Sequence, residues 1–231
     1  MNSLSIVIPF YNEQENVARV LAEVCGAQPD AEIIAVDDGS SDGTWELILA
    51  DPCCRGLRMA KNQGQSAALL AGLRQATGDI VVMMDGDGQN DPADIKVLLD
   101  GFAREQVDVV CGYRARRRDS ASRRLASRCA NAIRRLFFDD GLRDTGCSLK
   151  ACRRQAIDHL IAFNGIHRYL GAFFKKAGFT IAEVPTNHRP RGGGVSKYTN
   201  LDRALRGVYD LIGVGWYLKR MVDPSDTSES K

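Results

Sequence analysis

The sequence predicts a single α/β domain in which helices cover both faces of a mostly parallel central sheet. Its 231 residues, 44% of them hydrophobic, suffice for one sizeable core. Apolar runs alternate along the chain with segments of helical periodicity. Continuous apolar runs are typical of parallel strands, because helical crossovers bury both faces of such a sheet.

The elements are expected in a regular order. The expected strands span residues 4–10, 32–37, 57–60, 79–85 and 107–112. The expected helices span residues 13–25, a segment opening near Ser41 or Asp42, 64–76, 92–104, 119–138 and 200–222. Asn12 suits the N-cap of the first helix, and Pro92 suits the first position of the helix that ends near Arg104.

The cysteines and the first residues favour a cytoplasmic protein. The seven cysteines are scattered without a C-x-x-C pair, which predicts reduced thiols and neither a disulfide framework nor a zinc site. The apolar run after Met1 lacks a basic region and a cleavage site, so it is interpreted as a strand and not as a signal peptide. No apolar stretch reaches the roughly 18 residues that a membrane span needs.

Carboxylates follow three of the predicted strands. Glu13 follows the first strand, Asp37 and Asp38 end the second, and Asp85 and Asp87 follow the strand at 79–85. Ligands of parallel sheets bind beyond the carboxyl ends of the strands, where these charges would converge. Buried anions must be paired or hold a metal ion, and oxygen ligands favour Mg²⁺ or Mn²⁺ over zinc.

Other interpretations of these motifs were tested against the residues. The stretch "VDDGSSDGT" taken alone is ordinary turn chemistry. An EF-hand loop starting at Asp85 fails, because Asn90 stands where glycine is required and Lys96 where glutamate is required. Neither a Walker A motif nor a G-x-G-x-x-G motif occurs, so an ATPase or a dehydrogenase is not expected.

Five motifs in order carry a resemblance that extends from about residue 4 to 218. They are "IVIPFYNEQENV", "EIIAVDDGSSDGT", "MDGDGQNDP", "DTGCSLKACRR" and "HRPRGGGVSKY". Together they resemble family 2 inverting glycosyltransferases, most closely the polyprenyl-phosphate sugar transferases similar to dolichol-phosphate mannose synthase. This resemblance implies a GT-A-like, nucleotide-sugar-binding α/β domain whose D-x-D segment holds a divalent ion on the donor's pyrophosphate.

The resemblance also implies roles for individual residues. Asp85, Asp87 and Asp144 are the implied catalytic residues, and Asp87 with Gln89 would bind Mg²⁺ or Mn²⁺. The implied nucleotide-sugar contacts are Pro9, Tyr11, Glu13, Val36, Asp38, Asp85, Gly86, Arg114, Arg191 and Lys197. The glycine-rich segment with Arg191 and Lys197 suits a mobile flap that brings cations onto the pyrophosphate, the alternative being a flexible basic linker.

An arginine-rich segment points to an anionic acceptor. Nine arginines and the single acid Asp119 lie between Arg114 and Arg135. A solvated helix face is the simple alternative, but arginine forks suit phosphate oxygens. The expected acceptor-phosphate contacts are Arg117, Arg123, Arg124 and Arg128. Because a lipid monophosphate arrives already anionic, Asp144 is expected to act either as a base or only to orient an arginine or bind a sugar hydroxyl.

The histidines and the C-terminal segment complete the expectations. His159, His167 and His188 are expected in the core, at caps or against substrate, and not as metal ligands. The glycosyltransferase domain is expected over 1–222 and a polar tail over 223–231. Residues 200–222 are interpreted as an interfacial helix, with packing on the domain as the alternative.

The expected function is transfer of a sugar from GDP-mannose or a UDP-sugar to a polyprenyl phosphate. The protein is expected at the cytoplasmic face of the membrane as a peripheral protein. Its expected partners are a membrane protein or a second copy of itself, and it is not expected to bind nucleic acid. The alternatives are a family 2 transferase that glycosylates a lipid, glycan or protein hydroxyl with Asp144 as base, and a receiver-like signalling module.

Overall fold

The computed structural model describes residues 2–115, 133–138, 140–190 and 200–222, with side chains described from 207 onward in the last range. The strands are β1 (Leu4–Phe10), β2 (Glu32–Asp37), β3 (Arg55–Arg58), β4 (Ile80–Met83), β5 (Val109–Arg114), β6 (Lys150–Arg153) and β7 (Ile181–Thr186). The helices are α1 (Val17–Ala27), α2 (Thr44–Ala50), α3 (Gln65–Gln75), α4 (Asp94–Glu105), α6 (Leu170–Lys176) and α7 (Asn200–Arg220), with short 3₁₀ turns η1 (Arg154–His159) and η2 (Ile166–Arg168).

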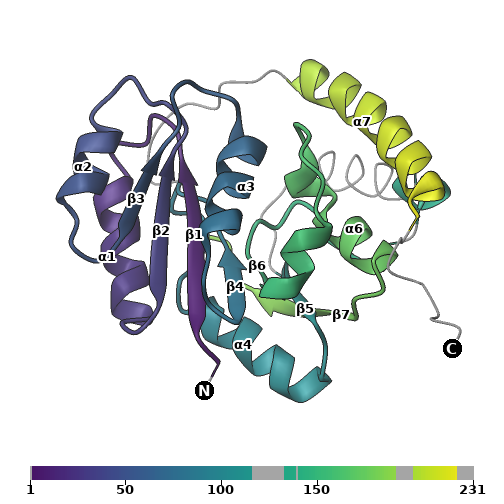
Figure 1. The fold of residues 1–231 in the computed structure, drawn as a ribbon, viewed down its shortest axis with the longest axis horizontal. Helices are drawn as coiled ribbons and strands as arrows, with labels where there is room; N and C mark the ends of the chain where they lie inside the picture. The colour runs from purple at the N-terminus through teal and green to yellow at the C-terminus, as the bar shows by residue number, and fades with distance from the viewer. Residues whose placement is uncertain (1, 116–132, 139, 191–199, 223–231) are drawn as a thin grey trace, which may run out of the picture.

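All seven strands form one sheet in the order β3-β2-β1-β4-β6-β5-β7 (Figure 1). Strand β6 runs antiparallel to its neighbours β4 and β5, and the other strand pairs are parallel. The mostly parallel α/β sheet predicted from the sequence is therefore confirmed. The sequence patterns had not indicated β6 or β7.

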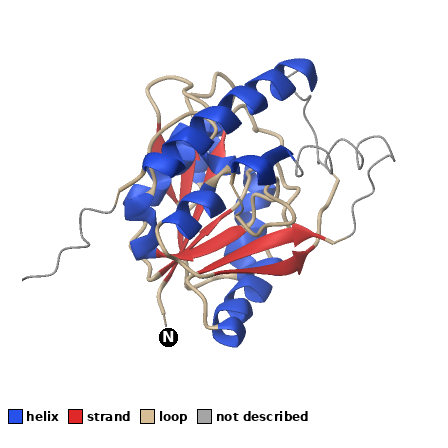
Figure 2. Cartoon of the chain, turned by 90° about the vertical axis from the view of Figure 1, so that its right-hand side faces the viewer, coloured by secondary structure: helices blue, strands red, loops and turns tan. Residues whose placement is uncertain are grey.

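Helices cover both faces of the sheet, as Figure 2 shows. Alternate residues of β1 point to opposite sides: Val7 packs into a core with α3, α6 and α7, whereas Ile6 and Ile8 pack into a core with α1, α2 and α4. Both sets of side chains are fully buried. This double burial explains why β1 and β2 are continuous apolar runs, since neither face of these strands meets water.

The first helix begins later than its sequence predicted. Helix α1 starts at Val17 with Asn16 in the N-cap position, because residues 13–16 form a turn in which the amides of Asn16 and Val17 donate to the carbonyl of Glu13. Asn12 adopts a left-handed conformation (φ 51°), and its side-chain oxygen accepts a hydrogen bond from the Ser41 amide (2.9 Å). Asn12 thus links two loops instead of capping a helix.

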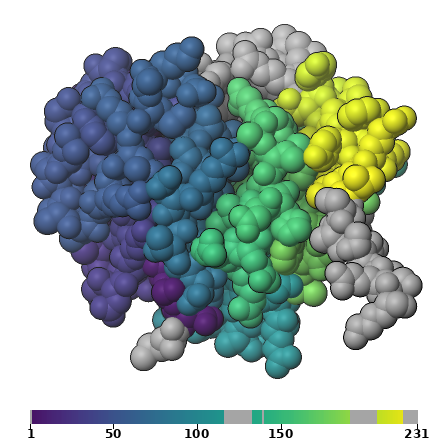
Figure 3. Space-filling view, viewed as in Figure 1, coloured from purple at the N-terminus to yellow at the C-terminus, as the bar shows by residue number. Residues whose placement is uncertain are grey.

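Helix α7 confirms the predicted C-terminal helix and packs on the domain. Its residues Leu211, Val214 and Leu218 are buried against the core that contains α6, and the Tyr169 hydroxyl donates to the carbonyl of Gly207 (3.3 Å). Figure 3 shows the helix, in yellow, at the surface of the molecule. Among the described residues, no helix combines the length and the apolar character that crossing a membrane requires.

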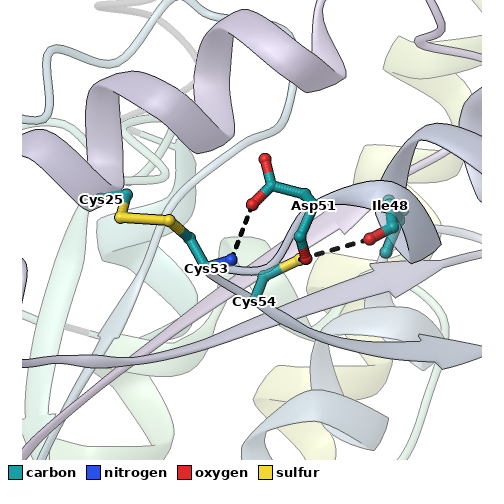
Figure 4. The surroundings of a disulfide bond; sticks show 5 residues. All are labelled: Cys25, Ile48, Asp51, Cys53 and Cys54. Carbon is teal, nitrogen blue, oxygen red and sulfur yellow. Dashed lines mark hydrogen bonds between the residues drawn. A yellow bond between two sulfur atoms is a disulfide. The ribbon is translucent and has the colours of Figure 1, made fainter.

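The expectation that all cysteines are reduced is wrong for one pair. Cys25 at the end of α1 and Cys53 in the loop after α2 form a disulfide, with their Cα atoms 6.2 Å apart (Figure 4). The two residues are 28 positions apart, and only the packing of α1 beside α2 brings them together. Cys54, Cys111, Cys147 and Cys152 are free thiols, and Cys129 lies outside the described residues.

Candidate active site

The acid-bearing loops meet at one edge of the sheet. Strand β1 lies between β2 and β4 and is parallel to both, with Phe10 opposite Asp37 and Val7 opposite Met83. The carboxyl ends of these three strands therefore point the same way, to the upper edge in Figure 1. This is the edge at which open α/β sheets bind ligands, as expected from the sequence.

The acids at the end of β2 are held by the protein itself. Asp37 pairs with Arg58 (3.2 Å), and Asp38 accepts hydrogen bonds from the Asn62 side chain (2.9 Å) and the amides of Gln63 (2.9 Å) and Gly64 (2.8 Å). Burial raises the pKa of Asp38, and the bonds from the Gln63 and Gly64 amides oppose that rise. Of the two outcomes expected for buried anions, pairing or a metal ion, these two residues therefore show pairing with the protein.

Asp85 and Asp87 carry like charges that repel each other. Burial, followed by the charge of Asp87, raises the pKa of Asp85 to about 6. One Asp85 oxygen accepts a hydrogen bond from the Gln65 side chain at the start of α3 (2.6 Å). Gly86 separates the two acids, and a Cβ there would lie 2.4 Å from the Phe10 ring, so only glycine lets the D-x-D segment lie against β1.

The donor set around Asp87 fits a hard divalent ion. The Asp87 carboxylate lies beside the backbone of Gln89, whose amide nitrogen donates to it (3.1 Å). Carboxylate and side-chain amide oxygens are preferred ligands of Mg²⁺ and Mn²⁺, and a cation bound here would relieve the repulsion between Asp85 and Asp87. Over the described ranges, no three His, Cys, Asp or Glu side chains converge as a ready-made metal cluster.

His188, one of the three histidines expected in the core, at caps or against substrate, lies at this edge. Its Nε2 is 3.4 Å from the Gln89 side-chain nitrogen, and residues Asn90 and His188 form an isolated antiparallel bridge. The placement follows from β7, which runs parallel to β5 and delivers residues 187–190 to the same edge. The alternating segment "TIAEVPTNH" was the available signal for this strand.

Arg189 fixes the segment that leads to the predicted flap. Its guanidinium donates to Glu23 of α1 (2.6 Å) and pairs with Asp91 of the acidic loop (2.7 Å), and its amide donates to the carbonyl of Gln89 (2.9 Å). The flap residues Arg191 and Lys197 lie outside the described residues. The same holds for the expected acceptor contacts Arg117, Arg123, Arg124 and Arg128.

Arg114 and Asp144 form a two-bond ion pair. The Arg114 Nε and Nη2 atoms each donate to a separate oxygen of Asp144 at 2.8 Å, and the side chains are only 20% and 10% exposed. The amides of Arg114 and Gly146 donate to the same carboxylate (both 3.2 Å). Of the two roles foreseen for Asp144, this geometry suits orientation of an arginine.

The implied nucleoside contacts are only partly available as side chains. Pro9 and Tyr11 stand at the end of β1, and Tyr11 is exposed. The Glu13 carboxylate accepts a hydrogen bond from the Asn16 side chain (2.7 Å). The Val36 side chain is fully buried in the core with α3, so Val36 can offer a ligand only its backbone.

A cavity of about 220 Å³ adjoins Asp85. Pro9 and Asp85 line it, together with several polar residues that the sequence patterns did not single out as site residues: Gln65, Thr145, Ser148, His167 and Arg168. These residues come from the start of α3, the loop before β6 and the turn η2. Because such loops converge only in the folded chain, no local pattern marked them as a group.

Known proteins resemble the chain at the level of both sequence and fold. Residues 5–161 match the model of the family described as "Glycosyl transferase family 2". The dodecaprenyl-phosphate galacturonate synthase of Rhizobium johnstonii is 34% identical, over 96% of this chain and 69% of that protein. The undecaprenyl-phosphate 4-deoxy-4-formamido-L-arabinose transferase of Yersinia pestis is 35% identical, over 92% of this chain and 67% of that protein.

A solved structure supports the fold. Glucosyl-3-phosphoglycerate synthase from Mycobacterium tuberculosis, in complex with Mn²⁺, uridine diphosphate and glucosyl-3-phosphoglycerate, superposes with a TM-score of 0.73 over 96% of this chain and 82% of that one. Its sequence identity is 21%, so it speaks for the fold alone. The family match and the two relatives confirm the resemblance drawn from the five motifs: the chain belongs to glycosyl transferase family 2, and these relatives are polyprenyl-phosphate sugar transferases.

Proposed function

We propose that this protein transfers a sugar, with inversion, from a nucleotide-diphosphate sugar to a polyprenyl phosphate in a reaction that depends on Mg²⁺ or Mn²⁺. The donor is GDP-mannose or a UDP-sugar. The observation that carries the proposal is the Arg114–Asp144 ion pair at the edge that also bears Asp85 and Asp87. In this pair Asp144 orients the Arg114 guanidinium, which can then bind a phosphate group. Because Asp144 is engaged in this way, the site suits an acceptor that arrives already ionised and needs no base to remove a proton.

On the donor side, Pro9, Tyr11, Glu13, the Val36 backbone and Asp38 would surround the nucleoside, and Asp85 with Gly86 would contact the nucleotide-sugar. Asp87 and Gln89 would hold the divalent ion, with the His188 imidazole beside Gln89. When bound, such an ion stabilises the negative charge that develops on the departing diphosphate. Arg114, Arg191 and Lys197 would contact phosphate oxygens.

On the acceptor side, the two relatives act on polyprenyl phosphates according to their names. We assign Arg117, Arg123, Arg124 and Arg128 to the acceptor phosphate because arginine forks match its oxygens. The alternative of a hydroxyl acceptor requires Asp144 to remove a proton. The bidentate contact with Arg114 favours the orienting role instead.

Helix α7 supports peripheral contact with a membrane. Opposite its buried residues, the helix exposes a line of large apolar side chains: Val208 (53%), Tyr209 (81%), Ile212 (54%) and Trp216 (60%). Aromatic residues of this kind sit well at the level of lipid head groups. The domain over 1–222 would then present its site to the head group of the acceptor, with the tail 223–231 outside it.

The membrane contact is tested by sedimentation with anionic lipid vesicles. Trp216→Ala is expected to reduce the bound fraction, whereas Leu49→Ala on α2, which removes an equally exposed apolar side chain (62%) elsewhere, leaves it unchanged. Equal binding of the two variants would count against α7 as the contact surface.

Transfer is tested with Mn²⁺, a panel of labelled GDP- and UDP-sugars, and a short polyprenyl phosphate. Label is expected in the organic phase, and EDTA or the substitution Asp87→Asn is expected to abolish it. Asp100→Asn is the matched control, since Asp100 lies exposed on α4, where it pairs with Lys96 (3.0 Å). Label that remains in water or on a soluble acceptor would refute the polyprenyl phosphate as acceptor.

A further inference from the structure

His167 lines the cavity beside Asp85, and its hydrogen-bond partners determine which ring nitrogen carries the hydrogen. We propose that this cavity receives the sugar ring of the donor, and that His167, oriented by Ser66, donates a hydrogen bond to that ring from Nε2. The inference rests on the proposed function, and it adds a sugar-contacting residue and a positioning residue outside the five motifs. The motifs end before or begin after both residues.

Ser66 sets the tautomer of His167. The Ser66 hydroxyl is fully buried, accepts a hydrogen bond from the Gly165 amide (2.9 Å) and lies 2.7 Å from His167 Nδ1. A serine hydroxyl has one hydrogen to donate, and the buried Ser66 hydroxyl donates it to His167 Nδ1. Nδ1 therefore accepts, and the ring hydrogen resides on Nε2.

A second contact on His167 would favour the other tautomer, but it is longer. The Arg168 Nε lies 3.4 Å from His167 Nε2, which is beyond the usual range of a hydrogen bond to nitrogen or oxygen, whereas the contact with Ser66 is within it. The shorter bond decides the assignment. Burial, with the nearby charges of Arg168 and Lys150, lowers the pKa of His167 to about 3, so the imidazole is neutral at physiological pH.

The lining of the cavity suits a sugar better than a phosphate. Asp85 supplies acceptor oxygens on one side, and His167 supplies a donor. The Ser148 hydroxyl donates to the Asn90 side chain (2.9 Å), so its oxygen is left to accept, and Leu69 with Leu170 forms an apolar wall. A sugar ring carries hydroxyls that both donate and accept, and its C–H groups pack on apolar surface. Arg168 also lines the cavity, but its guanidinium pairs with Asp210 (3.7 Å), and a phosphate in the cavity would be repelled by the Asp85 carboxylate.

The size and position of the cavity agree with this occupant. Its volume of about 220 Å³ lies below the range of roughly 300–1,000 Å³ that is common for drug-sized ligands, so it suits one monosaccharide and not a whole nucleotide-sugar. Pro9, an implied nucleoside contact, lines the same cavity. A donor whose nucleoside lies at the end of β1 would thus place its sugar beside Asp85 and His167.

The first test compares binding of UDP and GDP with binding of UDP-glucose, UDP-galacturonate and GDP-mannose by calorimetry with Mn²⁺. His167→Leu is expected to weaken binding of the preferred nucleotide-sugar about tenfold, the value of one hydrogen bond, and to leave binding of the free nucleotide unchanged. His167→Gln, whose amide can donate from a similar position, is expected to stay within about threefold of the parent by the same reasoning. His159→Gln is the matched control, because His159 packs against Phe179 and does not line the cavity.

The second test observes the tautomer directly, by an NMR measurement that requires no activity, and adds a kinetic comparison. Nitrogen-15 NMR of histidine-labelled protein is expected to show neutral His167 with its hydrogen on Nε2, and Ser66→Ala is expected to remove this preference and to raise the KM for the donor without changing that for the polyprenyl phosphate. Thermal melting of each variant checks that it folds. If Ser66→Ala does not fold, the spectrum of the parent protein alone tests the tautomer.

The outcomes separate this inference from the proposed function. A protein that binds a nucleotide-sugar, prefers it to the free nucleotide through His167, and yet transfers nothing to polyprenyl phosphate would refute the acceptor and uphold the inference. Unchanged nucleotide-sugar binding in His167→Leu, a hydrogen on Nδ1, or no binding of any nucleotide-sugar by the parent protein would overturn the inference.

Discussion

Replacing Asp144 by asparagine separates the two roles that this acid can have. The substitution keeps the shape of the side chain but removes its charge and one of the two oxygens that receive the Arg114 guanidinium at 2.8 Å. A hydrogen bond to a charged group contributes about 1.5–3 kcal/mol, so an orienting role predicts a loss of roughly 10- to 100-fold in kcat/KM for the donor. Loss of a general base would cost roughly 100- to 10,000-fold in kcat.

Because these ranges touch, a double-mutant cycle with Arg114→Lys decides between them. If Asp144 acts through Arg114, the double variant is no slower than Arg114→Lys alone, since lysine cannot form the paired bonds that the carboxylate orients. The assay is initial-rate transfer of labelled sugar to polyprenyl phosphate over pH 5–9. Asp100→Asn is the control, because it removes the exposed carboxylate of the Lys96–Asp100 pair on α4 (3.0 Å) and is expected to change the rate little.

Two results would refute the orienting role. One is a multiplicative loss in the double variant, which would mean that Asp144 contributes independently of Arg114. The other is the disappearance, in Asp144→Asn alone, of the acidic limb of the pH-rate profile, which would identify Asp144 as the group that must be ionised to take a proton.

Three further predictions concern stability. Gly86→Ala is expected to lower the free energy of unfolding by about 1–3 kcal/mol, because its Cβ would lie 2.4 Å from the Phe10 ring, whereas Gly26→Ala, with nothing within 4 Å, raises it slightly. Cys25→Ser is expected to cost about 3–4 kcal/mol, the entropy of a loop closed over 28 residues. Because the folded-state pKa of His167 is lowered to about 3, the unfolded state binds a proton below pH 6.5 that the folded state does not. Stability therefore falls with decreasing pH between about 6.5 and 3, by up to about 1.4 kcal/mol per pH unit, and His167→Gln removes this contribution.

Denaturant titrations check each of these predictions. Equal stabilities of Gly86→Ala and Gly26→Ala would show that the D-x-D segment is not pressed against β1. A Cys25→Ser variant as stable as the oxidised parent, while reductant leaves the parent unchanged, would contradict a stabilising disulfide. An unchanged pH slope in His167→Gln would assign the slope to other groups.

The fold could be predicted where strands are buried on both faces. Strands β1, β2, β4 and β5 are continuous apolar runs, and their parallel order follows from the helices between them. Strand β6 could not be found in this way, because it begins at Lys150, a lysine that is almost fully buried and donates its ammonium hydrogens to the carbonyl of Cys147. A charged residue at a core position contradicts every apolar pattern, and only the tertiary contact accounts for it.

The acids of the candidate site could be predicted from the sequence, but the residues that form hydrogen bonds with them could not. The D-x-D segment and its edge followed from strand ends, whereas the pairing of Asp38 with the 62–64 loop depends on how far that loop approaches Gly39. A Cβ on Gly39 would lie 2.6 Å from the Lys61 backbone, which fixes this approach. Hydrogen bonds between distant loops leave no periodic trace in a sequence.

The reversed direction of β6 determines which parts of the chain can shape this site. In a wholly parallel sheet, the segment that enters a strand lies on the side remote from the ligand. Since β6 starts beside the end of β4, with Lys150 opposite both Met83 and Cys111, its entering segment lies at the edge that bears Asp85 and Asp87 and brings Asp144 and Ser148 there. One antiparallel strand thus brings a further loop segment to the edge where the six parallel strands end. Substitutions or insertions in that segment can change the candidate site while the parallel strands and the turns that follow them stay as they are.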